Sequence, residues 1–213
     1  MMRWIRWIAP VLMVLVSVMA SMQAPAAAAA DLEKARALVT EVAEQGVREV
    51  VGANVPQAEK IERFRGLFDR YFDMPSIARF VLGRSWKDAD AAQQTRFVEQ
   101  FRELNVYTWA RRFKDYNGQK LAVTGVQADG DAGAYVDTMV EQTEGQKPLS
   151  VRWRLRMRED GWRVVDLIVE GVSMAITYRS EYSAALSDPS VTVGRLNDLI
   201  RLQIEQMKAQ QPS

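Results

Sequence analysis

The chain of 213 residues contains neither cysteine nor histidine. Histidine triads, cysteine nucleophiles, histidine-rich metal sites and disulfide frameworks are therefore excluded. The glycines form neither a GxGxxG fingerprint nor a GxxxxGK phosphate loop, and no serine begins a Ser-x-x-Lys motif. Carboxylates are what remains for acid–base chemistry.

A second long apolar run is also missing, because the one strongly apolar stretch lies at the N-terminus. After the basic start Met1–Arg6, an apolar run reaches Ala20 and an alanine-rich stretch follows to Ala30. The run is shorter than the roughly 18–20 residues of a spanning helix, and small residues follow it. We therefore predict a cleaved signal peptide over residues 1–30, with an uncleaved anchor as the alternative, and an exported protein.

The charge balance is close to neutral. Removal of residues 1–30 takes away two arginines and no acid, which leaves 26 basic against 27 acidic side chains. A net charge of −1 is a poor match for a general nucleic-acid binder, which carries a clear basic excess. The remaining residues, 31–213, are long enough for a single domain with a sizeable core.

Hydrophobic periodicity changes along this domain from helical to strand spacing, which predicts an α+β fold. Asp73 and Gly83 have the residue types that bound a short helix between them. The segment after Gly171 fits either a strand or a helix, with Ser173 as a possible cap. The expected helices are 31–51, a helix around 61–72, 74–82, 91–115 and one around 193–207, and the expected antiparallel strands are 120–127, 133–141, 149–159 and 162–170.

The last two of these strands form the most informative segment. Residues 151–158 alternate between apolar side chains and arginines, so one face of the strand is apolar and the other cationic. A two-residue turn at Asp160-Gly161 would place Asp166 and Ile168 on the face of Trp153. Because the returning strand is apolar on both sides, it borders either a packed core or a cavity.

Two sets of charged residues on this hairpin have alternative interpretations. Asp166 could act as a general base in an apolar site, with Glu170 about 13 Å along the strand, or it could be a satisfied buried acid. The arginine face could be a solvated sheet face paired with neighbouring acids. Alternatively, Arg152, Arg154 and Arg156 could dock an acidic partner or anionic head groups.

Three segments carry a resemblance to a known family. FDMPSIARFVLGRSW (72–86), VRWRLR (151–156) and GWRVVDLIVEGVSMAITYRSEY (161–182) resemble the MlaC, or toluene-tolerance auxiliary, family of periplasmic phospholipid-binding proteins. The resemblance covers about residues 33–205. It implies a curved antiparallel sheet of about four strands, packed with helices around an apolar pocket, as in a nuclear-transport-factor-like core with extra helices.

The same resemblance implies a function and partners. Such a protein holds phospholipid acyl chains and shuttles lipid between an outer-membrane lipoprotein complex and an inner-membrane ABC transporter, which preserves outer-membrane lipid asymmetry. It implies a periplasmic monomer without cofactor, metal or catalytic residue. A related branch is associated with hopanoids, so a hopanoid or another hydrophobic ligand is an alternative. Residues expected near the pocket are Phe80, Val81, Tyr135, Met139, Trp153, Leu155, Val164, Ile168, Val169, Val172, Met174, Ile176 and Tyr178.

Three hypotheses therefore remain open at the level of sequence. The first is a lipid carrier with no catalytic step, because an acyl chain leaves a membrane only for comparably apolar surroundings. The second is an enzyme on a similar cone-shaped fold that uses Asp166 or Glu170 as base. The third is an adaptor with a filled core that binds an acidic protein through the arginine face.

Overall fold

The structure is a computed structural model that describes residues 24–142 and 146–210. Residues 1–23 of the predicted signal peptide lie outside the described residues. Cleavage of the signal peptide stays a prediction. Residues 24–30 belong to the first helix. None of the described helices is long and apolar enough to cross a membrane.

The helices occupy both ends of the chain, and the strands lie between them. The N-terminal set ends in a short 3-10 turn before the first strand. Predicted helices at 74–82 and near 193–207 are confirmed, whereas the helix predicted to reach residue 115 ends at Ala110. The elements are α1 (Ala24–Gln45), η1 (Gly46–Val51), α2 (Gln57–Tyr71), α3 (Met74–Leu82), η2 (Gly83–Trp86), α4 (Ala91–Ala110), η3 (Phe113–Asp115), α5 (Met174–Ala185) and α6 (Val193–Ala209).

A single antiparallel sheet with the strand order β1-β2-β3-β4-β5 follows the chain. The four predicted strands are confirmed to within one or two residues, and a short fifth strand was not predicted. The predicted α+β class is confirmed. The strands are β1 (Lys120–Ala128), β2 (Gly133–Glu141), β3 (Leu149–Arg158), β4 (Gly161–Val169) and β5 (Val172–Ser173).

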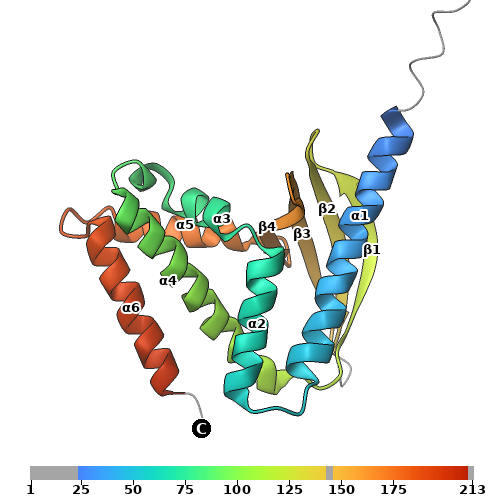
Figure 1. The fold of residues 1–213 in the computed structure, drawn as a ribbon, viewed down its shortest axis with the longest axis horizontal. Helices are drawn as coiled ribbons and strands as arrows, with labels where there is room; N and C mark the ends of the chain where they lie inside the picture. The colour runs from blue at the N-terminus through green and yellow to red at the C-terminus, as the bar shows by residue number, and fades with distance from the viewer. Residues whose placement is uncertain (1–23, 143–145, 211–213) are drawn as a thin grey trace, which may run out of the picture.

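The molecule has two apolar cores rather than one. One lies between α1 and the apolar face of the sheet, where Ala35 and Val39 meet residues such as Leu155 and Val164. The other joins α2, α3, α4 and α6. Figure 1 shows α1 along the sheet and the remaining helices extending to the other side of β4. Phe72 packs against both cores, as do Leu38 and Val42 of α1, so α1 and the junction between α2 and α3 connect them.

This junction is fixed to the free edge of β4. The Asp73 amide donates a 3.0 Å hydrogen bond to the Val164 carbonyl, and Phe72 forms an isolated parallel bridge with Val164. A strand edge offers unpaired backbone groups, and here the helical layer pairs with some of them. The helices are therefore positioned by β4.

The β3–β4 hairpin differs from its predicted register. The turn residues are Glu159 and Asp160, because Arg158 pairs with Gly161. A bulge then adds Val165 to β4, so that Arg154 faces Asp166 and Trp153 faces Leu167. One extra residue moves every later side chain to the opposite face. The prediction that Asp166 and Ile168 share the face of Trp153 is therefore wrong.

The N-cap of α3 also ties this helix to the sheet. One Asp73 carboxylate oxygen accepts a 3.1 Å hydrogen bond from the Ser76 amide, and the other accepts a 2.7 Å hydrogen bond from Arg158 Nε on β3. Burial works to raise the pKa of the Asp73 carboxyl, but the hydrogen bonds from Ser76 and Arg158 outweigh it, so the pKa lies below its usual value. Asp73 is therefore held as a carboxylate.

We expect Asp73→Ala to lower the free energy of unfolding by about 2 kcal/mol, because both the cap and the ion pair are lost. Asp90→Ala is the matched control, since Asp90 caps α4 through a 2.8 Å bond from the Gln93 amide without such a link to the sheet. It should cost about 1 kcal/mol. Urea unfolding followed by circular dichroism measures both, and equal losses would contradict a stabilising link to β3.

Candidate functional site

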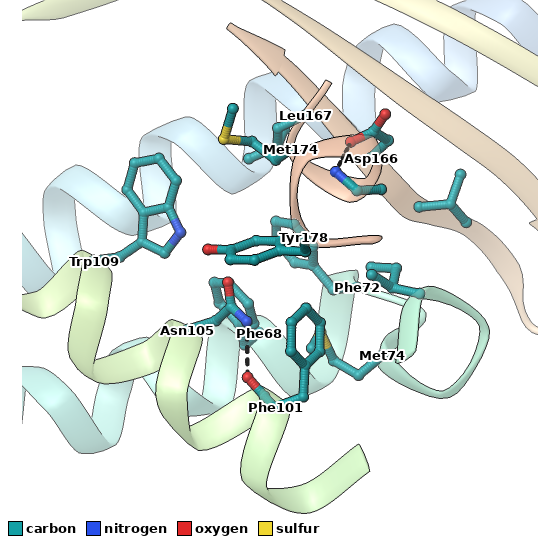
Figure 2. A pocket seen from close by; sticks show the side chains of 13 residues that line it. Phe68, Phe72, Met74, Phe101, Asn105, Trp109, Asp166, Leu167, Met174 and Tyr178 are labelled. Carbon is teal, nitrogen blue, oxygen red and sulfur yellow. Dashed lines mark hydrogen bonds between the residues drawn. The ribbon is translucent and has the colours of Figure 1, made fainter. Parts of the chain in front are cut away.

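A small apolar cavity lies where the helices meet β4 (Figure 2). Its volume is about 40 Å³, which has room for only a few water molecules. Side chains from α2, α3, α4 and α5 and from the bulged part of β4 form its wall. The lining residues are Phe68, Phe72, Met74, Ile77, Phe101, Asn105, Trp109, Val165, Asp166, Leu167, Met174, Ala175 and Tyr178.

Aromatic rings make up much of this wall. Phe68 and Phe72 stack with their centroids 4.4 Å apart, and Tyr178 meets Phe101 edge to face at 5.2 Å. Figure 2 shows Tyr178 across the middle of the cavity, between Trp109 and Phe72. The lining is accordingly rich in rings, aliphatic side chains and methionine, a composition suited to hydrocarbon.

The Asn105 amide and the Asp166 carboxylate of the lining are held by neighbouring atoms. Asn105 is buried and its amide donates a 2.7 Å hydrogen bond to the Phe101 carbonyl one turn earlier. Asp166 accepts a 2.5 Å hydrogen bond from the Ser173 hydroxyl and a 2.9 Å hydrogen bond from the Ala175 amide. Both Asp166 oxygens thus fix the start of α5 against β4. This is the geometry of a satisfied acid.

The second predicted carboxylate lies away from the lining. Glu170 is exposed at the β4–β5 turn with a φ of 49°, and its side chain accepts a 2.5 Å hydrogen bond from the Ser150 amide. Within residues 24–142 and 146–210, no group of three or more acidic residues could hold a metal ion. The cavity therefore offers an apolar enclosure rather than a set of convergent catalytic groups.

The predicted pocket residues are dispersed over the molecule. Met174 and Tyr178 line the cavity. Val81 lies in the helical core, whereas Trp153, Leu155, Val164 and Val169 belong to or pack on the core beneath α1. Tyr135, Met139 and Ile168 lie on the arginine-bearing face, because they pair with Arg154, Ser150 and Arg152. Phe80, Val172 and Ile176 are exposed.

Most residues that line the cavity are not among those predicted to lie near a pocket. Phe68, Phe72 and Phe101 are recognisable in the sequence as apolar positions at helical spacing, a pattern that indicates a buried face without naming its neighbour. Val165 and Leu167 line the cavity at the bulge in β4, which the alternating pattern does not reveal. The sequence pattern therefore indicates that the lining residues of the helices are buried, but it does not indicate that Val165 and Leu167 of β4 line a cavity.

Each arginine of the predicted docking set has an acidic partner. Arg152 binds Asp137 at 2.6 Å, and Arg154 and Arg156 bind Asp129 at 2.7 and 2.6 Å. The guanidinium carbons of Arg152 and Arg154 also lie 5.4 and 5.6 Å from the centre of the Tyr135 ring. The geometry matches the alternative of a sheet face paired with neighbouring acids. Docking at this face stays a prediction.

Two tyrosines beside the cavity have altered titration. Burial raises the pKa of Tyr178 and of Tyr182 above the usual tyrosine value, and the nearby Tyr178 adds to the effect at Tyr182. Tyr182 also meets Phe97 edge to face at 5.7 Å. A raised pKa in the folded state means that the protonated hydroxyl stabilises the fold at all pH values below the unfolded pKa of about 10.

We therefore expect stability to fall as the pH rises above about 10, where the unfolded chain loses the tyrosine proton first. Tyr182→Phe removes this ionisation, so between pH 9 and 11 the variant should lose about 1 kcal/mol less than the unsubstituted chain. Urea unfolding at several pH values measures the difference. Parallel pH profiles for the two proteins would show that Tyr182 is not buried enough to matter.

The family model described as "MlaC protein" matches residues 47–193, more than half of the chain. The chain belongs to the MlaC family. The match runs from η1 to the first residue of α6, so it includes every element that lines the cavity.

Two known proteins are similar to this chain. The Haemophilus influenzae "Intermembrane phospholipid transport system binding protein MlaC" is 28% identical over 108 residues, which are 49% of this chain and 50% of that protein. The match thus spans about half the length of this MlaC relative. A phospholipid-binding protein from Ralstonia solanacearum, solved in complex with a phospholipid, is 20% identical with a TM-score of 0.68. The match covers 84% of this chain and 98% of that one, and it supports the fold.

Proposed function

We propose that this chain is an exported lipid carrier that holds phospholipid acyl chains in the cavity between β4 and helices α2 to α5. The observation that carries the proposal is the apolar lining, in which aromatic and aliphatic side chains from five elements converge. Membership of the MlaC family supports the same function. The names of the Haemophilus and Ralstonia proteins, which describe phospholipid transport and phospholipid binding, support the ligand class.

The energetics of transfer favour such a lining. Each methylene removed from water is worth about 0.8 kcal/mol, so an acyl chain needs an enclosure that excludes water along most of its length. The polar head group gains nothing from this environment and stays at the mouth. Asn105 and Asp166 of the lining have hydrogen-bond partners within the protein, so neither requires a polar ligand group.

The cavity must widen to admit an acyl chain, because its volume is about 40 Å³. The position of the cavity favours this widening. It lies at the seam between two apolar cores, which share Phe72 and also Leu38 and Val42 of α1, and α5 is held to β4 by the short β5 and by the Asp166 hydrogen bonds. We infer that the two cores part on the cavity side, while Leu38 and Val42 of α1 stay in contact with both. The acyl chain would then fill the space that opens between them.

The wider role follows the family resemblance. We propose that the carrier acts in the periplasm as a monomer, between an outer-membrane lipoprotein complex and an inner-membrane ABC transporter. It performs no catalytic step and uses no cofactor. Asp166 serves as an anchor for α5 in this proposal, since both its oxygens accept hydrogen bonds from the start of that helix.

The direct test is analysis of the bound ligand. The protein is purified from the exported fraction of the cell, extracted with organic solvent and examined by mass spectrometry, while uptake of labelled phospholipid from vesicles is followed separately. We expect phospholipid in the extract and uptake from the vesicles. A hopanoid in the extract would change the ligand class, and the absence of both lipid and uptake would contradict the carrier function.

A further inference from the structure

Three exposed apolar side chains come from the segments that enclose the cavity. Phe80 of α3 is 42% exposed, Val172 of β5 is 53% exposed and Ile176 of α5 is 58% exposed. The inner sides of α3 and α5 line the cavity through residues such as Met74 and Tyr178. The same two helices therefore have apolar side chains both toward the cavity and toward solvent. A surface helix needs apolar side chains only on the face that packs on the core of the protein.

These side chains form one surface because α3 and α5 pack along each other (Figure 1). The Arg179 guanidinium donates a 3.2 Å hydrogen bond to the Phe80 carbonyl and lies 4.8 Å from the centre of the Phe80 ring. Ile176 is three residues before Arg179 and thus beside it on α5. Val172 lies two residues before the first residue of this helix. We call Phe80, Val172, Ile176, Arg79, Arg84 and Arg179 the α3–α5 patch.

The charge of the α3–α5 patch is positive. Arg79 and Arg84 are exposed on either side of Phe80 in the sequence, and across the described residues neither they nor Arg179 form an ion pair. Asp73, at the N-terminal end of α3, is already paired with Arg158. Glu181 follows Arg179 by two positions, so it lies on the opposite flank of α5. The cations of the patch are thus available to an anionic partner.

We propose that the α3–α5 patch docks the protein onto the surface of a bilayer that contains anionic phospholipid. Apolar side chains next to cations suit the boundary where acyl chains meet phosphates, and the Arg179–Phe80 pair places both chemistries at one point. Three apolar side chains are few for a stable protein interface, which buries about 800 Å² on each partner. Membrane docking here rests on the proposed carrier function, because it brings the cavity wall to the lipid source.

Vesicle co-sedimentation tests the proposal. The chain is purified from the cell fraction in which it accumulates, and intact mass confirms that all variants share one N-terminus. We expect binding to phosphatidylethanolamine vesicles that contain phosphatidylglycerol, weak binding to phosphatidylcholine vesicles, and release by salt. Arg79→Gln with Arg84→Gln should weaken binding about 25-fold, at about fivefold for each arginine, and Ile176→Gln should weaken it about tenfold.

Matched controls come from exposed residues elsewhere. Arg96→Gln with Arg195→Gln makes the same change in net charge at exposed arginines of α4 and α6. Leu199→Gln with Leu202→Gln removes apolar side chains of α6 that are 41% and 43% exposed. Both control pairs should leave vesicle binding unchanged. Equal losses in the controls, or unchanged binding in the patch variants, would overturn the proposal.

A soluble short-chain phospholipid separates this proposal from the carrier function. The patch variants should bind it like the unsubstituted chain, because the patch residues do not line the cavity. If the chain docks on vesicles through the patch but never takes up lipid, the carrier function fails and the docking surface stands. If the unsubstituted chain does not bind anionic vesicles and the patch instead binds an acidic protein, the membrane-docking proposal is overturned.

Discussion

Replacement of Phe101 by alanine is expected to lower the free energy of unfolding by about 3–5 kcal/mol. Phe101 is 1% exposed and belongs to the helical core, where its ring stacks 5.7 Å from Phe97 and meets the edge of Tyr178 at 5.2 Å. Alanine would remove these ring–ring interactions and leave a void that rigid neighbours on α4 and α5 fill only in part. Urea unfolding measured by circular dichroism gives the loss directly.

Phe80→Ala is the control for this large effect. The same residue type is removed from α3, but Phe80 is exposed and its ring contacts the Arg179 guanidinium. We expect a loss below about 1 kcal/mol, the value of an exposed cation–π contact. A loss for Phe101→Ala no larger than that of its control would mean that the aromatic cluster is not the stabilising core of the helical layer.

The local boundaries of the fold could be predicted from single residues. Asp73 and Gly83 bound α3 as expected, because a carboxylate can cap the first turn and glycine accepts the φ of 58° found at its end. Ser173 likewise caps α5 by accepting a hydrogen bond from the Ile176 amide. The segment after Gly171, whose sequence fits either a strand or a helix, is therefore a helix from Met174 onward. These features depend on residues within one turn, so the sequence contains all of the information they need.

The face of the sheet on which each β4 side chain lies depends on contacts with residues that are distant in the sequence. Alternation identified β3 and β4, but the bulge at Val165 inserts one residue and turns Asp166 toward the arginine face. No glycine or proline marks the bulge in this segment. The bulge lies beside the α5 start that Asp166 anchors and beside Val164, whose carbonyl binds the Asp73 amide. The change of register thus coincides with the contacts that the helices make at this edge.

The cavity could not be located from periodicity for a related reason. A helical stripe shows which side of α2 or α4 is buried, and it does not show whether that side meets another helix or the sheet. Trp153 and Leu155 satisfied the apolar pattern equally well, and they pack beneath α1. The lining instead gathers where Phe72 joins two cores, a position fixed by contacts between segments that are about 90 residues apart, such as Asp73 with Val164.

The sharpest test of the cavity as the ligand site is a charge at Met174, which should weaken binding of a soluble short-chain phospholipid at least 100-fold. Met174 lines the cavity, so a glutamate there would lie against the acyl chain, and an uncompensated buried charge costs about 3–5 kcal/mol. The substitution should be tolerated in the free protein, because Met174 is partly exposed in the first turn of α5, where a negative charge is favourable.

Ile176→Glu is the matched control for Met174→Glu. It adds the same charge two residues later on the same helix, but Ile176 is 58% exposed and lies outside the cavity lining. Its affinity for the soluble lipid should therefore stay within about twofold of the unsubstituted value, since a charge left in water has no desolvation cost. Thermal unfolding shows whether both variants are folded, and Met174→Gln gives a neutral variant in case the charge at position 174 unfolds the protein. Equal affinities of the position-174 variants and the Ile176→Glu control would mean that the lipid binds somewhere other than the seam between the two cores.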